Sequence, residues 1–141
     1  MLKGINPLIG PDLLHALAAM GHGDELVIAD RNFPSHRIGQ RVVELRGHDA
    51  AVVARALMEL LPLDRAVEQP VLRMATSEGD DDIPPVHAEV IAAVGPHLAE
   101  GQRVGAVERF AFYERAAEAY LVVVTGEGRP YGDFILCKGV L

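Results

Sequence analysis

Length, composition and charge exclude several classes of protein. The 141 residues are 50% hydrophobic and 23% charged, which is the profile of one globular domain whose core needs no disulfide or structural metal. The single cysteine, Cys137, can form neither an internal disulfide nor a cysteine-based zinc cage. A net charge of −7 without a basic cluster argues against nucleic acid as a partner, and no apolar run approaches the roughly 18 residues that span a bilayer.

The N-terminal segment, residues 1–7, lacks the apolar stretch of a signal peptide. We therefore expect a cytoplasmic protein without a membrane partner. The sequence contains no internal repeat, low-complexity tract or linker, so one domain over residues 1–141 is expected.

In the first half of the chain, predicted helices alternate with short predicted strands. Pro11 suits a first helical turn and Gly21 a C-cap, and Asp49 is well placed to cap a second helix. Short apolar runs between these segments are too short for helices and rich in strand-forming residues. The expected order is a helix from 11 to 20, strands at 25–30 and 41–45, and a helix from 49 to 61.

The second half of the chain continues this alternation. Pro84 and Pro85 predict the start of a helix, and Gly95-Pro96 predicts its end. Residues 120–125 give the clearest strand pattern of the chain. The expected order is a strand at 71–76, a helix through 94, a strand at 104–107, a helix at 110–119, and strands at 120–125 and 134–138.

The order of these elements predicts the fold class. Strands that alternate with helices indicate an α/β domain with helices on both faces of the sheet. The last two predicted strands are joined by a turn at 126–130, so an antiparallel hairpin is expected there. We therefore predict a single domain with a mixed β-sheet.

Two polar residues flank the first predicted strand. His22 lies in a glycine-rich turn before this strand, and Asp30 lies at its carboxyl end. An imidazole can both give and take a proton near neutral pH, and loops at strand ends are where α/β domains assemble their sites. Both residues are therefore candidates for catalysis. The alternative for His22 is a structural cap at the end of the preceding helix, where a cation is favoured.

Two further segments contain candidate binding residues. Arg109 lies between a predicted strand and a predicted helix, and its planar guanidinium suits vicinal hydroxyls or a carboxylate. The alternative is an exposed ion pair between Arg109 and a neighbouring glutamate. The triad Tyr131-Gly132-Asp133 can present a phenol, backbone groups and a carboxylate to a polar ligand, or it can be an ordinary turn.

Other familiar motifs are missing. The acidic loop at residues 80–82 does not have the spacing of a calcium loop and is interpreted as a solvated surface. The histidines have no metal-ligand spacing, and there is no phosphate loop, nucleophile elbow or dinucleotide fingerprint. No metal or cofactor is therefore expected. The aromatic residues Phe110, Phe112 and Tyr113 are interpreted as packing residues.

Short motifs are spread along the whole chain: Leu2-Lys3, Pro7-Leu8-Ile9, residues 20–25, Asp30, Phe33-Pro34, His36, residues 109–116, Thr125-Gly126-Glu127, Tyr131-Gly132 and Lys138-Gly139-Val140. Together, in this order and at this spacing, they resemble the RbsD/FucU family of sugar ring-form isomerases, which contains D-ribose pyranases and L-fucose mutarotases. The block at 110–116 and the glycine at position 23 are similar to the fucose mutarotase branch.

The resemblance implies a role for each candidate residue. His22 matches the family's proton donor, whereas Asp30, Arg109 and the Tyr131-Gly132 turn match residues that line the sugar site. The family's usual asparagine is replaced here by Asp133, which leaves the identity of the sugar open. The resemblance also implies a ring-shaped homo-oligomer, typically a decamer, with sites close to subunit boundaries.

The expected activity is a mutarotase reaction on L-fucose or a related sugar, with interconversion of pyranose and furanose forms as a further outcome. Ring opening requires one group to protonate the ring oxygen and another to remove the anomeric hydroxyl proton. We expect His22 to act as the acid, Asp30 to hold or tune it, Asp133 or Tyr131 to handle the other proton, and Arg109 to fix hydroxyls. The alternatives are D-ribose pyranase-type activity, a non-catalytic sugar-binding protein on the same scaffold, and a purely structural assembly unit.

Overall fold

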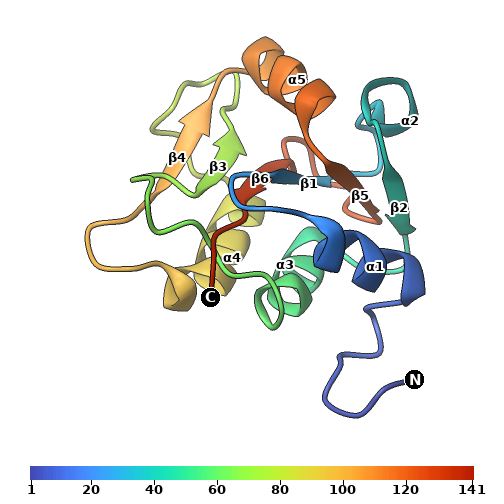
Figure 1. Cartoon of the computed structure of the whole chain (residues 1–141). Coiled ribbons are helices and arrows are strands. Elements are labelled where there is room, and N and C mark those ends of the chain that lie inside the picture. Colours follow the sequence, from blue (N-terminus) through green and yellow to red (C-terminus); the bar gives the residue numbers. More distant parts are fainter.

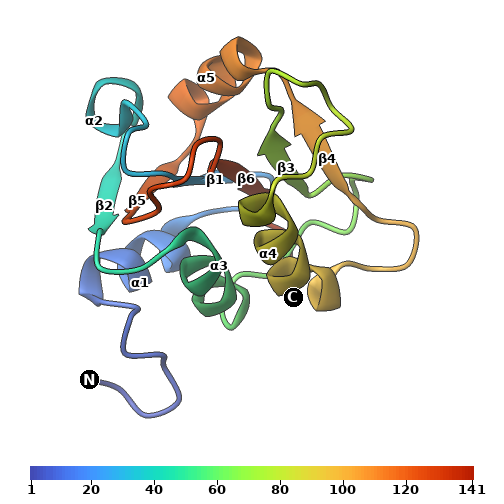
Figure 2. The ribbon, with the colours of Figure 1, turned by 180° about the vertical axis from the view of Figure 1, so that it is seen from behind.

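Six strands form one mixed sheet, and helices cover both of its faces (Figure 1 and Figure 2). The computed structural model describes residues 1–141. The strands lie in the spatial order β2-β5-β1-β6-β3-β4 and are β1 (Glu25–Ala29), β2 (Val42–Leu45), β3 (Val71–Met74), β4 (Val104–Val107), β5 (Leu121–Thr125) and β6 (Phe134–Cys137). The helices are α1 (Pro11–Ala19), α2 (Ser35–Ile38), α3 (Ala50–Met58), α4 (Pro85–Val94), α5 (Arg109–Glu118) and the 3-10 helix η1 (Gly95–His97).

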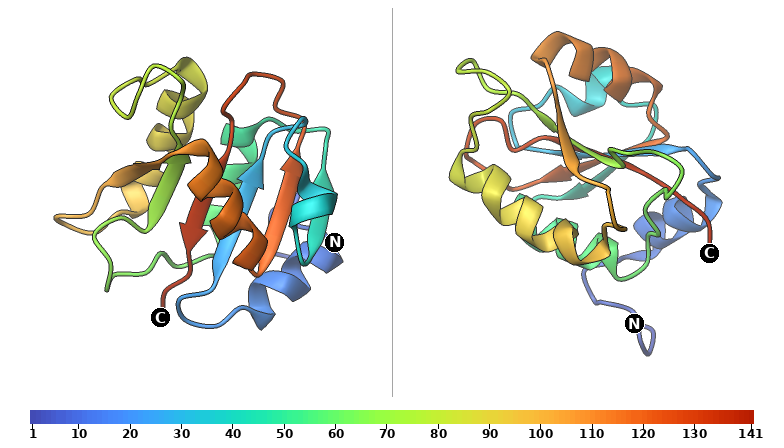
Figure 3. Two further views of the ribbon diagram at one scale, coloured as in Figure 1. Left: turned by 90° about the horizontal axis from the view of Figure 1, so that it is seen from above. Right: turned by 90° about the vertical axis from the view of Figure 1, so that its left-hand side faces the viewer.

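The sheet separates two hydrophobic cores because alternate residues of a strand point to opposite faces. Leu26 and Ile28 of β1 belong to the larger core, with residues of α1, α3 and α4. Val27 and Ala29 belong to the smaller core, with Phe112 of α5. The right-hand view of Figure 3 shows α1, α3 and α4 on one side of the sheet and α2 and α5 on the other. The predicted α/β fold with helices on both faces is therefore confirmed.

The predicted hairpin between the last two strands is wrong, because β1 lies between β5 and β6. Ile28 of β1 pairs with Val123 of the parallel strand β5 and with Phe134 of the antiparallel strand β6. The connection over residues 126–133 exceeds the two to five residues of a tight hairpin and is long enough to cross one strand. The sheet is mixed as predicted, but it is mixed because β6 runs antiparallel to β1 and β3.

This topology gathers the ends of several strands at one edge of the sheet. Strands β1, β3, β4 and β5 are parallel to one another and end there, whereas the antiparallel strand β6 begins there. The connection from β5 to β6 therefore passes over the carboxyl end of β1 (Figure 3, left). Such an edge is where α/β sheets place ligand sites.

Most predicted boundaries hold to within one or two residues. Pro11 is the first residue of α1, and Asp49 caps α3 by accepting a hydrogen bond from the Val52 N–H at 2.9 Å. The prediction that this second helix extends to Leu61 is wrong, because α3 ends at Met58 and Leu61 packs into the core from the loop that follows. No helix has both the length and the apolar character needed to cross a membrane.

Candidate functional site

A cavity of about 270 Å³ opens at the carboxyl ends of the parallel strands. We call this region the cavity edge. Its volume lies just below the roughly 300–1,000 Å³ of sites for drug-sized ligands, so it suits a smaller molecule such as a monosaccharide. It brings together four of the predicted site residues, and its lining consists of Asp30, Asn32, Phe33, Met74, Arg109, Tyr113, Pro130, Tyr131 and Asp133.

Asp30 and Asp133 form a buried pair of carboxyl groups in this cavity. The Asp30 backbone N–H donates to Asp133 Oδ1 at 2.8 Å. Asp30 Oδ1 accepts from the backbone N–H groups of Asn32 at 2.9 Å and Phe33 at 2.8 Å, which fixes the turn that leaves β1. Burial and the adjacent Asp30 charge raise the pKa of Asp133 well above its usual value. The protonated form of Asp133 is therefore favoured.

Arg109 reaches the same cavity from the first turn of α5. Its Nε donates to Tyr113 Oη at 3.1 Å, and this hydrogen bond raises the pKa of Arg109 above its ordinary value. The neighbouring Glu108 instead caps α5 by accepting from the N–H groups of Phe110 at 2.9 Å and Ala111 at 3.1 Å. Arg109 consequently has no ion pair with a glutamate, and its two terminal nitrogens are available to a ligand.

Tyr131 is held in an unusual backbone conformation. Its φ of 62° lies in the left-handed region, where a non-glycine residue is uncommon. His87 of α4 is fully buried and donates from Nε2 to the Tyr131 carbonyl at 2.7 Å, while its Nδ1 accepts from Arg73 at 3.3 Å. Burial lowers the pKa of His87, which keeps the neutral imidazole that both contacts require. The core thus supports the turn that presents Tyr131 to the cavity.

Gly132 lies beneath the cavity instead of lining it, and it is required by close packing. A Cβ atom at this position would come within 2.6 Å of Glu127 Cγ. The Glu127 carboxylate is buried and accepts from Arg129 Nε at 2.8 Å, and this contact lowers the pKa of Glu127 to about 2. Glu127 also accepts from the Ala50 N–H at 3.4 Å. These contacts anchor the connection that crosses β1.

His22 lies at the opposite edge of the sheet, before β1. Its Nε2 is 3.2 Å from Asp64 Oδ1, and its side chain is 53% exposed. Gly23 has a φ of 83°, so the turn beside His22 does use a conformation that favours glycine. The Ala66 N–H and His22 lower the pKa of Asp64 in spite of its burial. Asp64 is therefore an anionic partner that orients the imidazole, and we call this region the histidine edge.

The alternative role of His22 as a helix cap is not supported. Lys138 supplies the cation at the end of α1, since its Nζ donates to the carbonyls of Leu17 at 2.8 Å and Met20 at 2.5 Å. The His22 ring instead faces a second cavity of about 480 Å³ with a mainly apolar lining. A positioned but solvent-accessible imidazole at this edge is free to meet a ligand or another subunit.

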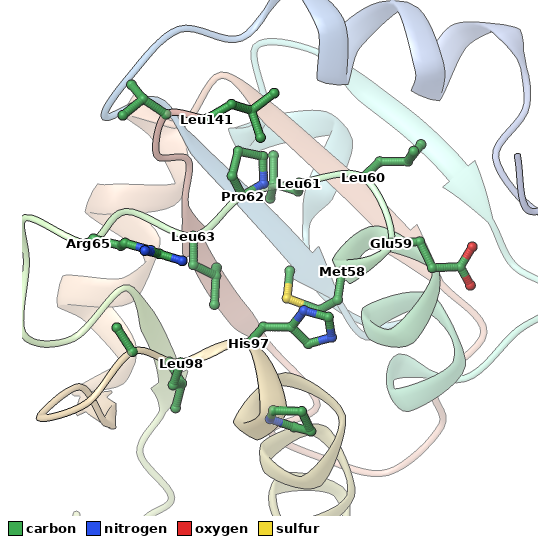
Figure 4. Close-up of a pocket in the computed structure, with 13 residues that line it drawn as sticks. Met58, Glu59, Leu60, Leu61, Pro62, Leu63, Arg65, His97, Leu98 and Leu141 are labelled. Atoms are coloured by element: carbon green, nitrogen blue, oxygen red, sulfur yellow. The ribbon is translucent and has the colours of Figure 1, made fainter. Parts of the chain in front are cut away.

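The largest cavity, of about 820 Å³, also lies at the histidine edge (Figure 4). Eight of its 13 lining residues are hydrophobic, and it shares Leu60, Pro62, Val140 and Leu141 with the cavity beside His22. The side chains of Val140 and Leu141 are largely exposed. The histidine edge therefore carries an extended apolar surface around the C-terminus, in contrast to the polar cavity edge.

One chain does not bring all the predicted site residues together. His22 precedes β1 and Asp30 follows it, so the five residues of that strand separate them by about 16 Å of extended backbone. The expectation that Asp30 holds or tunes His22 within one chain is therefore not met, because Asp64 is the acid in contact with His22.

Asp64, His87 and Tyr113 contact the predicted site residues His22, Tyr131 and Arg109, and none of the three was predicted to do so. The expectation that the aromatic cluster is packed holds for Phe112, which is fully buried, but is wrong for Phe110, which is 65% exposed. The two residues point to different sides of α5, and only one side faces the sheet.

The acidic loop has an internal role beyond a solvated surface. Arg73 donates to the backbone carbonyls of Asp80 and Asp82, and Asp82 Oδ2 accepts from Thr76 Oγ1 at 2.5 Å. No cluster of three or more His, Cys, Asp or Glu side chains has an arrangement that could hold a metal ion. Because Arg73 also donates to His87 Nδ1 at 3.3 Å, this arginine links the acidic loop to His87.

Comparisons with known proteins cover nearly the whole chain. The model of the RbsD / FucU transport protein family matches residues 3–141. An L-fucose mutarotase of Actinobacillus pleuropneumoniae is 45% identical over 140 residues, which cover 99% of this chain and 97% of that protein. The structure of FucU from Bifidobacterium longum is 41% identical with a TM-score of 0.91, and covers 99% of both chains. A fucose mutarotase in complex with L-fucose from Streptococcus pneumoniae is 36% identical with a TM-score of 0.91, again over 99% of both chains.

Proposed function

The chain belongs to the RbsD/FucU family, and from this premise we propose that it is an L-fucose mutarotase, an isomerase that interconverts the anomers of a free monosaccharide in the cytoplasm. The observation that carries the proposal is the cavity edge, where a carboxylate, a guanidinium and a phenol line a space of about 270 Å³. A sugar hydroxyl can donate to the carboxylate and accept from the guanidinium at the same time. The groups at this edge thus match a small polyol.

The chemistry needs only proton transfers. Ring opening breaks the bond between C1 and the ring oxygen, as an acid protonates the ring oxygen and a base removes the proton of the C1 hydroxyl. The open chain then carries a carbonyl at C1, and reclosure on its other face gives the second anomer with both protons returned. A positioned acid or base contributes typically 10²–10⁴-fold to such a reaction. No electrons are transferred to or from the sugar.

We assign the roles at the cavity edge by what each side chain can donate or accept. Asp30 and Arg109 bind adjacent hydroxyls and keep the open chain from rotating away. Tyr131 handles the proton of the C1 hydroxyl, whereas Asp133 acts on the sugar only through Asp30. Gly132 lets the turn that carries Tyr131 and Asp133 pack closely against Glu127. His22 is the acid that protonates the ring oxygen.

His22 must come from a second subunit in this proposal, because the whole of β1 separates it from Asp30 within one chain. The apolar surface around the C-terminus supports contact between copies, since burial of such a surface favours association. We propose that the histidine edge of one subunit packs against the cavity edge of the next. Repetition of this head-to-tail contact closes a ring, for which the family suggests a decamer.

Exchange NMR on equilibrated L-fucose tests the activity directly. Magnetisation transfer between the α and β anomeric protons should increase in proportion to protein concentration. D-ribose, D-galactose and other monosaccharides measured in parallel identify the preferred sugar and any pyranase activity. A protein that binds these sugars in titrations but leaves every exchange rate at its buffer value would be a binding protein, and the enzyme proposal would be wrong.

Complementation tests whether two subunits share each site. Oligomers of His22→Gln and of Arg109→Gln are each expected to lose most of their activity, but their mixture after subunit exchange should regain part of it. Random mixing leaves both wild-type groups in about one quarter of the sites. No recovery in mixed oligomers, or a wild-type mass equal to the 15.2 kDa of one chain, would contradict the shared site.

A further inference from the structure

The Asp30–Asp133 pair is a second unusual feature of the cavity edge, and the inference drawn from it rests on the proposed function. Asp133 is 3% exposed and Asp30 is 7% exposed, and neither forms an ion pair with a basic residue. Two ionised carboxylates in contact and shielded from water would repel each other strongly. One of the two must therefore hold a proton.

The hydrogen bonds decide which acid holds the proton. Asp30 Oδ1 accepts from two backbone N–H groups, those of Asn32 and Phe33, and such donors stabilise the charged form of a carboxylate. Asp133 accepts from one backbone N–H only, and it does so through Oδ1, so its Oδ2 is the position for a proton. The side chains of Asp133 and Asp30 also contact each other directly, and this contact favours the protonated form of Asp133.

We propose that Asp133 is a neutral carboxylic acid at neutral pH, whose Oδ2–H donates to the Asp30 carboxylate and orients it toward the sugar. Asp133 is thus a positioning residue that acts through Asp30. The pair carries one negative charge, which the nearby Arg109 balances. This charge balance favours an uncharged monosaccharide over a sugar acid or a sugar phosphate as the substrate.

Few other titratable groups face this pair. Arg109 and Tyr113 approach from α5, and Tyr131 approaches from the connection that crosses β1. Glu127 lies behind Gly132, but its carboxylate is occupied by Arg129 and by the Ala50 N–H. The remaining cavity residues from β3 and from the turn after β1 are Met74, Phe33 and Asn32, and none of them titrates. The pH dependence of Asp133→Asn variants therefore reports mainly on the pair itself.

Folding stability as a function of pH tests the protonation state without reference to activity. An acid whose pKa is raised in the folded state contributes stability below its unfolded pKa of about 3.9, and this contribution is lost as pH rises toward the folded pKa. Asp133→Asn imitates the neutral acid at every pH. The difference in melting temperature, Asp133→Asn minus wild type, should therefore increase steadily between pH 5 and pH 9.

Asp81→Asn is the matched control, because it removes a similar charge from an exposed loop position. Its melting temperature difference should show no such rise. If the Asp133→Asn difference instead falls or stays flat between pH 5 and pH 9, Asp133 is ionised in the folded protein and the proposal is overturned. This outcome would leave the mutarotase proposal intact.

The positioning role is tested by comparing Asp133→Asn with Asp133→Leu in the exchange assay. Leucine has a similar size but can neither donate nor accept, so kcat/KM should fall at least about tenfold. Asparagine provides both a donor and an acceptor and should recover most of that loss. If the leucine variant is as active as the asparagine variant, Asp133 does not act through hydrogen bonds. If Asp133→Leu fails to fold, the anomer exchange rate of Asp133→Asn is compared with that of Asp30→Asn instead. Equally low rates in these two variants would contradict the positioning role of Asp133.

Discussion

The two edges of the sheet differ in almost every physical property that matters for binding. At the cavity edge, polar groups converge on a small cavity and are held by backbone hydrogen bonds and by the ion pair of Glu127 with Arg129. At the histidine edge, one imidazole and its aspartate partner border an extended apolar surface. The first edge suits a polar ligand, whereas the second exposes apolar side chains, whose burial would favour contact with another protein surface. A functional site that needs the polar cavity and the imidazole together can form only where two copies of the chain meet.

The largest expected effect comes from His22, because it alone supplies an acid from the histidine edge. His22→Gln keeps a polar side chain of similar reach but cannot be protonated near neutral pH. The anomer exchange rate is expected to fall by roughly 10²–10⁴-fold. Exchange NMR measures the rate, and light scattering confirms that the oligomer is unchanged.

His48→Gln is the control for this change, since His48 is exposed and lies away from both cavities. It should exchange anomers at the wild-type rate. Full activity of His22→Gln would reduce the histidine edge to an assembly surface and remove the need for a shared site.

A smaller effect is expected from Arg109 at the cavity edge. In the proposed function its terminal nitrogens bind the sugar, and one hydrogen bond to a charged group contributes about 1.5–3 kcal/mol. Arg109→Gln should therefore lower kcat/KM by about 10–100-fold. The control is Arg115→Gln on the same helix, because Arg115 pairs with Glu25 and does not line the cavity. Equal losses in the two variants would show a general effect of charge on α5 and not a contact with substrate.

The same comparison shows which parts of the fold could be predicted. Hydrophobic periodicity and capping residues identified nearly every helix and strand, because these signals are local. The order of strands is not local. Residues 120–125 and 134–138 both form buried strands, and their short separation favoured a hairpin, yet each of them pairs with β1. A periodic pattern gives the face that a strand buries but does not identify its neighbours.

The candidate site residues also divide into those with a local signal in the sequence and those that depend on distant contacts. Asp30, Arg109, Tyr131 and Asp133, which line one cavity, could be predicted because they follow or precede strands, and the first three also match family motifs. Asp64 could not, since it lies in an irregular segment that meets His22 through the isolated bridge between Leu63 and Lys138.

His87 gave a weak signal, as a lone histidine on the buried face of an apolar helix. Such a residue is usually a hydrogen-bonded core residue, and here its partner is the Tyr131 carbonyl at 2.7 Å. The burial of His87 could be predicted from its helix face, but its partner could not be identified without the course of the 126–133 connection.

The smallest expected effect separates structure from catalysis within the histidine edge itself. Lys138 and His22 line the same cavity, but Lys138 donates to carbonyls at the end of α1 whereas the His22 side chain pairs with Asp64. Lys138→Met keeps the aliphatic stem and leaves the carbonyls of Leu17 and Met20 without their donor. We expect a loss of about 1–2 kcal/mol in the free energy of unfolding.

A loss of this size corresponds to a melting temperature lower by about 3–8 °C, measured at matched protein concentration. His22→Gln should stay within about 0.5 kcal/mol of the wild type in the same assay, because an exposed imidazole contributes little to folding. If His22→Gln were the more destabilised of the two, its loss of activity would follow from misfolding at this edge. The opposite result, in which Lys138→Met is destabilised and His22→Gln is stable but inactive, assigns the imidazole to the reaction and the ammonium group to the scaffold.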